Sequence, residues 1–326
     1  MRKKVVLILG VFIIVFCYFT IVSATKVFRS TSHMPATLAS VEETIRLVLI
    51  TKELDTPFWN KVSQGAIKQA KEEHIQLEVW GSYGNNQDDF LKKVEIAIHS
   101  KVDGIIVQGL DNDQFKELVK VKAAFYGIPV ITVANDIPVE ESLRKTYIGS
   151  DQFWAGQKVA RQLIKDMGPA GEVIILGDRE KAFYQKERLA GIQEVLSGYP
   201  DIRSVVKGTA GTKEEVIGTT QQVMNEVPYA SAFIAINANY AGPMIQEIGR
   251  RTQVEPYYIY TFDDGVDSTP LLEQGKLDAI LEQKPEEMGS ESVKRLMEWI
   301  SGKTVPLNSK GYFTETRMVE AAGEER

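Results

Sequence analysis

The stretch GIIVQ (residues 104–108) places a glutamine directly after a short apolar run rich in β-branched residues. Four other runs along the chain stop in the same way on an amide or a carboxylate. In an open parallel sheet, ligands bind in the crevice beyond the carboxyl ends of the strands. These side chains therefore predict a cleft rich in hydrogen-bonding groups. The residues that end the five runs are Gln108, Asn135 with Asp136, Asn237, Asp263 and Gln283.

Strand-length apolar runs alternate with helix-length amphipathic segments from Ile45 onward. Thr56 can cap a helix that has Pro57 at its first position and runs to about Glu73. This alternation is typical of βαβ units with helices covering a parallel sheet. Roughly ten strands are too many for one comfortable sheet, so we expect an α/β fold with two Rossmann-like lobes. The predicted strands include residues 45–51, 76–80, 104–107, 129–133, 171–176, 202–206, 231–236, 256–262 and 277–282.

Composition and missing motifs exclude several classes of function. The net charge of −6 over 326 residues argues against a nucleic-acid partner. His33, His74 and His99 have neither metal-ligand nor triad spacing, and the sequence contains no P-loop, GxSxG or HExxH motif. We therefore predict no catalytic residue, no metal site and no cofactor. Asp136 and Asp263 could pair for glycoside hydrolysis, but nothing in the sequence fixes their separation.

The N-terminus predicts an extracytoplasmic protein. A basic start (residues 1–4) precedes an apolar run over residues 5–22, and Val22-Ser23-Ala24 resembles a signal-peptidase site. The run is also close to the length of a membrane span, so residues 1–24 are either a signal peptide or an uncleaved anchor formed by residues 5–24. In both cases the body lies outside the cytoplasm. The single cysteine, Cys17, is deep in the run behind a bulky Phe, which disfavours lipidation, and residues 25–44 form a tether.

Several motifs, in order, carry a resemblance to a known family. The body resembles a periplasmic sugar-binding protein of the ribose-binding type, whose fold also forms the effector domains of lactose-repressor-like regulators. The resemblance covers about residues 45–320. It rests on LDTPFWNKVSQGAIKQA (54–70), KVDGIIVQGLD (101–111), GIPVITVANDIP (127–138), YIGSDQFWAGQKVA (147–160), ERLAGI (187–192), AINAN (235–239), TFDDG (261–265) and GKLDAILEQKPEEMG (275–289).

The resemblance implies a type I periplasmic binding protein, in which a three-strand hinge joins two lobes that close on a monosaccharide. It implies crossings between lobes near Ser150, Gln283 and Thr314. The expected N-terminal lobe is then residues 45–150 plus 284–314, and the C-terminal lobe is residues 151–283 plus 315–326. We also expect a monomer that needs no cofactor.

The resemblance further implies roles for individual residues. Phe58 and Trp59, which follow Thr56, match an aromatic pair that faces the sugar ring, as an apolar sugar face would favour. Gln108, Asn237, Asp263 and Gln283 match amides and a carboxylate that bind hydroxyls. Asp263→Ala is therefore expected to abolish binding without lowering the melting temperature of the unliganded protein.

The chain departs from the family at three places. Ala134 and Asn135 stand where the family has an Asp followed by Arg or Ser, and Asp136 comes next. Lys186 replaces an arginine, and Lys cannot form the planar two-pronged contact of Arg. Gly211 and Thr212 stand near a family aromatic, which removes one wall of the pocket. The candidate ligand-binding residues are Thr56, Phe58, Trp59, Gln108, Asn135, Asp136, Lys186, Asn237, Asp263 and Gln283; which sugar they bind is open.

Three functional hypotheses follow. The first is a solute receptor of an ABC sugar importer, whose closed form is read by a membrane permease. The second is a membrane-anchored co-receptor that presents its closed form to a sensor kinase. A secreted glycoside-processing enzyme is a remote third. A repressor is disfavoured because an apolar export segment stands where the DNA-binding head would be.

Overall fold

The structure is a computed structural model that describes residues 13–21, 44–83, 86–180, 182–251, 257–263 and 265–321. The chain divides into two compact units, Met1–Thr44 and Ile45–Arg326. In the first unit, residues 13–21 are helical and Cys17 is an exposed free thiol. Within the described ranges, no helix combines the length and apolar character that a bilayer crossing requires. Most of the predicted export segment and tether lies outside these ranges, so both stay predictions.

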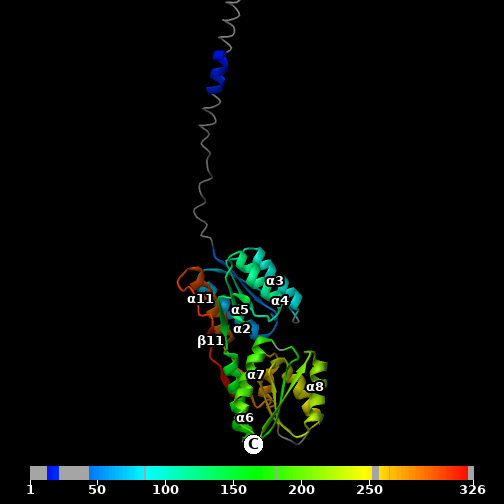
Figure 1. The fold of residues 1–326 in the computed structure, drawn as a ribbon. Coiled ribbons are helices and arrows are strands. Elements are labelled where there is room, and N and C mark those ends of the chain that lie inside the picture. Colours follow the sequence, from blue (N-terminus) through cyan, green and yellow to red (C-terminus); the bar gives the residue numbers. More distant parts are fainter. Residues whose placement is uncertain are drawn as a thin grey trace, which may run out of the picture. The chain divides into compact units, whose positions relative to one another are not determined.

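The first lobe of the second unit is built on a six-stranded sheet with the spatial order β11-β5-β4-β3-β1-β2, all parallel. Figure 1 shows α2, α3, α4, α5 and α11 around this sheet. The strands are β1 (Arg46–Thr51), β2 (Gln76–Gly81), β3 (Gly104–Gln108), β4 (Val130–Val133), β5 (Thr146–Gly149) and β11 (Tyr312–Phe313). The helices are α2 (Pro57–Glu72), α3 (Gln87–His99), α4 (Asp113–Glu117), the π-helical turn η1 (Leu118–Ala123), α5 (Val139–Ser142) and α11 (Pro285–Ile300).

The second lobe repeats this design with the order β12-β10-β9-β8-β6-β7, in which only β12 is antiparallel to its neighbour. Figure 1 shows α6, α7 and α8 on this lobe. The strands are β6 (Gly171–Asp178), β7 (Ile202–Thr209), β8 (Ala230–Ala235), β9 (Tyr258–Phe262), β10 (Ala279–Glu282) and β12 (Arg317–Glu320). The helices are α6 (Gln152–Met167), α7 (Phe183–Leu196), α8 (Lys213–Glu226), the 3₁₀ turn η2 (Ala238–Tyr240), α9 (Ala241–Arg251) and α10 (Ser268–Glu273).

Both sheets are buried on both faces, as parallel sheets usually are. In β1, Val48 and Ile50 pack into one apolar cluster, and Leu47 and Leu49 pack into the cluster on the other face. The second sheet lies between two further clusters in the same way. These layers confirm the predicted α/β class with two Rossmann-like lobes.

The chain passes between the two sheets three times: after β5, after β10 and after β11. The second crossing delivers α11 back to the first lobe, where it packs closely on α2. Gly65 and Gly289 permit this approach, because a Cβ on either one would collide with a backbone carbonyl of the opposite helix. The helix α2, which carries Phe58 and Trp59, is therefore packed between β1 and α11.

The predicted strands match the structure closely, and the main differences are three short strands that were not predicted and two strands, β6 and β7, that are longer than predicted. β5, β11 and β12 were not among the predicted runs, because they are only two to four residues long and lack an extended apolar pattern. β6 continues two residues beyond the predicted end, to Asp178. That extension is important for the site.

Candidate ligand-binding site

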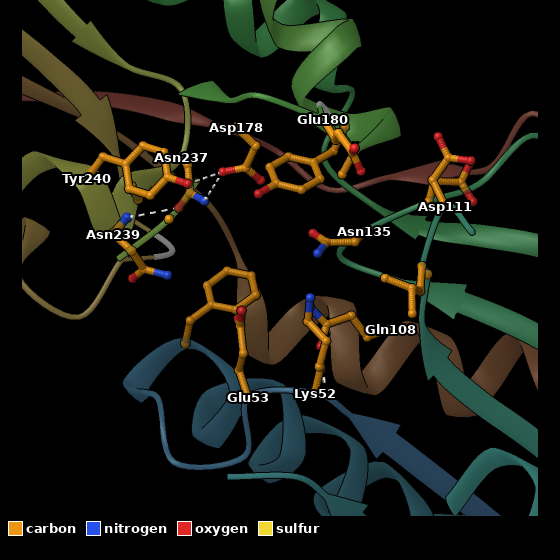
Figure 2. Close-up of a pocket in the computed structure, with 18 of the residues that line it drawn as sticks. Lys52, Glu53, Gln108, Asp111, Asn135, Asp178, Glu180, Asn237, Asn239 and Tyr240 are labelled. Atoms are coloured by element: carbon orange, nitrogen blue, oxygen red, sulfur yellow. Dashed lines mark hydrogen bonds between the residues drawn. The ribbon is translucent and has the colours of Figure 1, made fainter. Parts of the chain in front are cut away.

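A cavity of about 460 Å³ lies between the carboxyl ends of the strands of the two sheets (Figure 2). In each sheet the first strand of the lobe lies between the next two strands of the chain: β1 lies between β2 and β3, and β6 lies between β7 and β8. The strand order therefore reverses direction beside β1 and beside β6. Ligands of doubly wound sheets bind at this topological switch point. Lys52 and Gln108 come from the first switch point and Asp178 and Asn237 from the second, so the cavity joins both.

Six of the ten candidate residues line the cavity: Phe58, Trp59, Gln108, Asn135, Asp136 and Asn237. The other four, Thr56, Lys186, Asp263 and Gln283, are not among the lining residues. The structure adds lining residues that the sequence did not single out for the site, including Lys52, Glu53, Asp111, Asp178, Tyr184, Thr209, Asn239 and Tyr240.

Gln108 is held firmly at the end of β3 and is only 2% exposed. Its side-chain oxygen accepts hydrogen bonds from the Thr51 hydroxyl at 3.0 Å and from the backbone N–H of Lys52 at 2.8 Å. The neighbouring strand β1 therefore fixes the orientation of the amide. The amide nitrogen has no partner among the residues that the structure describes.

The end of β4 turns sharply before Asn135. Ala134 has a φ of 62°, and the Asn135 N–H donates to the Val133 carbonyl at 2.7 Å, which is a tight turn that is costly for a residue with a Cβ. The Gly109 N–H donates to the Asn135 carbonyl at 2.9 Å and holds the turn against β3. This strained turn places Asn135 at the cavity, with its side-chain amide making no hydrogen bond to the described residues.

Asp136 lies at the cavity, but its carboxylate already has partners. It accepts from Arg144 at 2.5 Å and from the Thr132 hydroxyl at 2.6 Å. Burial raises the pKa of Asp136 above its ordinary value, although the Arg144 charge opposes the shift. Arg144 also donates to the Ser309 carbonyl at 2.9 Å, so this ion pair fastens the segment that leads into β11.

The wall from the second lobe is organised around Asp178, at the end of β6. One carboxylate oxygen accepts from the Tyr240 hydroxyl and from the Asn237 side-chain nitrogen, the latter at 3.1 Å. The other accepts from the Gln185 side-chain nitrogen at 2.5 Å. Burial and the Asp178 carboxylate both raise the pKa of Tyr240, so its hydroxyl stays protonated. Figure 2 shows Asp178, Asn237 and Tyr240 together, opposite Lys52 and Gln108.

The sequence contains a signal for Asp178 of the same kind as for the other strand ends. GEVIILGD (171–178) is another apolar run that ends on a carboxylate, but the strand was predicted to stop at residue 176. Tyr184 and Tyr240 carried no such signal, because each lies within or beside a helix rather than at a strand end.

Aromatic rings lie on both walls. Phe58 and Trp59 are buried, with ring centroids 5.8 Å apart in an edge-to-face pair, and Tyr184 and Tyr240 lie on the opposite wall. Thr56 is the N-cap of α2: its hydroxyl accepts from the Trp59 N–H at 3.3 Å and donates to the Glu53 carbonyl at 3.1 Å. Thr56 therefore orients the aromatic pair from outside the cavity lining.

Asp263 and Gln283 bind each other at a crossing rather than lining the cavity. The Asp263 carboxylate accepts from the backbone N–H of Gln283 at 2.7 Å and from its side-chain nitrogen at 3.2 Å. The Gln283 side-chain oxygen accepts from the Ser150 hydroxyl at 2.8 Å. This chain of bonds ties the first crossing to the second, and in this structure it is a hinge network.

Lys186, on α7, contacts the other lobe. Its ammonium lies 3.1 Å from Asp111, which follows β3 and also pairs with Lys116 at 2.7 Å. Burial tends to raise the pKa of Asp111, but the bonds from Lys116 and Lys186 outweigh it and lower the pKa below the ordinary value. Lys186 and Asp111 thus form an ion pair between the lobes.

Arg188 is 1% exposed and supports the site from behind. It donates to the Gln152 side-chain oxygen at 2.7 Å and to the Ile236 carbonyl at 3.0 Å, and it stacks 3.7 Å from the Phe262 ring centre. Because Ile236 precedes Asn237, Arg188 helps to set the position of that amide. Over the described ranges, no group of three His, Cys, Asp or Glu residues is arranged to hold a metal ion.

Comparison with known proteins identifies the family. The model of the periplasmic binding protein domain matches residues 47–304, and the chain belongs to this family. Among curated relatives, the ribose import binding protein RbsB of Escherichia coli (strain K12) is 24% identical over 82% of this chain and 88% of that protein. The D-apiose import binding protein of Actinobacillus succinogenes is also 24% identical, over 60% of this chain but only 62% of that protein.

Solved structures agree with this assignment. GanP, a glucose-galactose binding protein from Geobacillus stearothermophilus, is 30% identical with a TM-score of 0.79, over 86% of this chain and 98% of that chain. XylFII, in its complex with LytSN, is 25% identical with a TM-score of 0.73, again over 86% of this chain and 98% of that chain. These findings confirm the resemblance seen in the sequence.

Proposed function

We propose that this protein is an extracytoplasmic receptor that binds a monosaccharide between its lobes and serves an ABC sugar importer. The observation that carries the proposal is the convergence of polar strand ends from two separate sheets on one aromatic-walled cavity. Amides and carboxylates supply donors and acceptors for hydroxyl groups, and ring faces supply the apolar contact that a sugar ring needs. The names of RbsB and of the D-apiose protein, both import binding proteins, support the same function.

Binding would be coupled to closure of the lobes. Gln108 and Asn135 belong to the first lobe, and Asn237 and Asp178 belong to the second. A ligand that contacts both sets has more contacts when the lobes are together, so it shifts the population toward the closed form. A membrane permease that recognises the closed form then receives only loaded receptor. Binding without turnover is part of the proposal, since the relatives described above are named as binding proteins.

A second function is supported by a specific observation. XylFII, a structural relative, has been solved in complex with another protein, LytSN. Together with the apolar N-terminal run, this favours the alternative of a membrane-anchored co-receptor that signals to a sensor kinase. Both functions use the same cavity and the same closure.

Isothermal titration of the full-length protein in mild detergent against a monosaccharide panel tests the shared claim. We expect at least one sugar to bind with a 1:1 stoichiometry; no heat with any sugar would refute it. Deletion of the gene then separates the partners. Loss of sugar uptake indicates the importer, whereas loss of sugar-induced transcription with uptake intact indicates the sensor.

A further inference from the structure

Two side chains at the corner of the cavity where β1 and β3 end, Gln108 and Lys52, present hydrogen-bond donors, while the nearby carboxylate of Asp111 is already paired with Lys116 and Lys186. At Gln108, the side-chain oxygen is occupied by the Thr51 hydroxyl and the Lys52 backbone N–H. Exchanging the oxygen and nitrogen of this amide would set the nitrogen against the Lys52 N–H, donor against donor. The two N–H donors of Gln108 therefore face away from β1. The Gln108 side chain is only 2% exposed, and it lines the cavity.

The second donor of this corner is the ammonium group of Lys52, the first residue after β1. Lys52 is half-buried and lines the cavity, and its side chain makes no ion pair or hydrogen bond with the residues that the structure describes. An ammonium has three N–H donors and no lone pair. A donor that is shielded from water and left unpaired is unfavourable, and more so when it is charged. The corner therefore favours a ligand atom that accepts hydrogen bonds.

The facing wall supplies acceptor oxygens. Asp178 is a carboxylate, which can only accept, and the Thr209 hydroxyl at the end of β7 is 1% exposed and makes no hydrogen bond with the residues that the structure describes. Hydroxyl groups of a ligand can donate to these oxygens. In Figure 2, Lys52 and Gln108 lie on one side of the pocket and Asp178 lies on the other.

We propose that Lys52 and Gln108 form a selection site for an acceptor-only oxygen, one that carries no hydrogen. Such an oxygen is either the ring oxygen of a cyclic sugar or a carboxylate oxygen of a sugar acid. A hydroxyl at this place must direct its own hydrogen elsewhere, so the site discriminates against alditols, in which a hydroxyl replaces the ring oxygen. This inference rests on the proposed function and specifies the class of ligand.

The test compares matched ligands by titration calorimetry: D-galactose with galactitol, D-ribose with ribitol, D-xylose with xylitol, and D-galacturonate as the acid. We expect an aldose or the acid to bind at least about ten-fold more tightly than the matched alditol, which is the effect of about 1.4 kcal/mol. Tighter binding of D-galacturonate than of D-galactose would identify a carboxylate at the corner, and the reverse order would identify the ring oxygen.

An open chain loses more conformational freedom on binding than a ring does, so variants are needed to isolate the corner. Gln108→Glu keeps the shape but replaces the two N–H donors by an acceptor, and Lys52→Met removes the ammonium. We expect each variant to weaken the aldose or acid by about ten-fold or more and the alditol by much less, so that the preference shrinks. Lys61→Met, which removes an exposed lysine of α2 outside the cavity, should leave every affinity unchanged.

The outcomes separate the inference from the function. If sugars bind but both variants weaken the aldose and its alditol by the same factor, the inference fails and the receptor function stands. If no ligand of the panel binds to the wild-type protein, the proposed function fails and the inference falls with it. Thermal unfolding of each variant shows whether a loss of affinity comes from a loss of fold.

Discussion

Replacing Lys186 by methionine should weaken ligand binding slightly and only at low salt. In the structure the Lys186 ammonium lies 3.1 Å from Asp111 across the two lobes, but the Lys186 side chain is 57% exposed. An exposed pair of this kind contributes about 0.2–1 kcal/mol. Asp111 keeps its second partner, Lys116 at 2.7 Å, so the substitution leaves no carboxylate without a cation.

The expected effect is therefore a rise in Kd of about two-fold, since about 0.4 kcal/mol is a factor of two at room temperature. Titrations in about 0.02 M and about 1 M salt should show the difference only in the first, because the screening length falls to about 3 Å at 1 M. Lys165→Met is the matched control: it removes an exposed ion pair with Glu320 that does not join the two sheets' lobes. It should leave Kd unchanged at both salt concentrations.

A loss of affinity of ten-fold or more that persists at high salt would refute this reasoning. Such a loss would mean that Lys186 contacts the ligand itself, as the sequence predicted. Equal effects of Lys186→Met and Lys165→Met would show that general surface charge, rather than the contact between lobes, controls binding.

Three further substitutions test the structure. Asp263→Ala should lower the melting temperature of the unliganded protein, by losing charge-assisted bonds worth about 1.5–3 kcal/mol to Gln283; unchanged unfolding would support a ligand contact instead. Arg144→Met should destabilise by about 3–5 kcal/mol, because it leaves Asp136 buried without its cation, and denaturant unfolding measures this. Asp111→Asn tests pH dependence: a carboxyl with a lowered pKa stabilises above its unfolded pKa, near 3.8, and loses this as the pH falls through the folded value. The stability difference from wild type should therefore shrink below about pH 4, and a constant difference would contradict the ion pairs.

The fold was largely predictable because parallel strands buried on both faces are continuous apolar runs. The elements that were missed are those where tertiary contacts, not local pattern, specify the strand. TYIG (146–149) has only four residues, and the two-residue β11 exists only through pairing with β5. No local pattern in the sequence reports such pairing.

The site was predictable at some strand ends and not at others, for a topological reason. Gln108 and Asn237 end strands beside the switch points and line the cavity. Asp263 and Gln283 follow β9 and β10, which lie further from the switch point and next to the crossing, and there the polar side chains bond to each other instead of lining the cavity. The position of a strand in the sheet order decides between these roles, and a single sequence does not state that order.

The repeated strand order of the two lobes gives the cavity a built-in polarity. Strand β1 of the first lobe corresponds to β6 of the second, because each lies between the second and third strands of its own lobe. The first ends on a neutral residue, Thr51, and the second ends on an anion, Asp178. Two halves of nearly equal architecture would otherwise accept a small ligand in either of two opposed directions. Because only one of the two equivalent strand ends carries a carboxylate, the two walls differ, and a sugar in the cleft matches both walls in only one of the two directions.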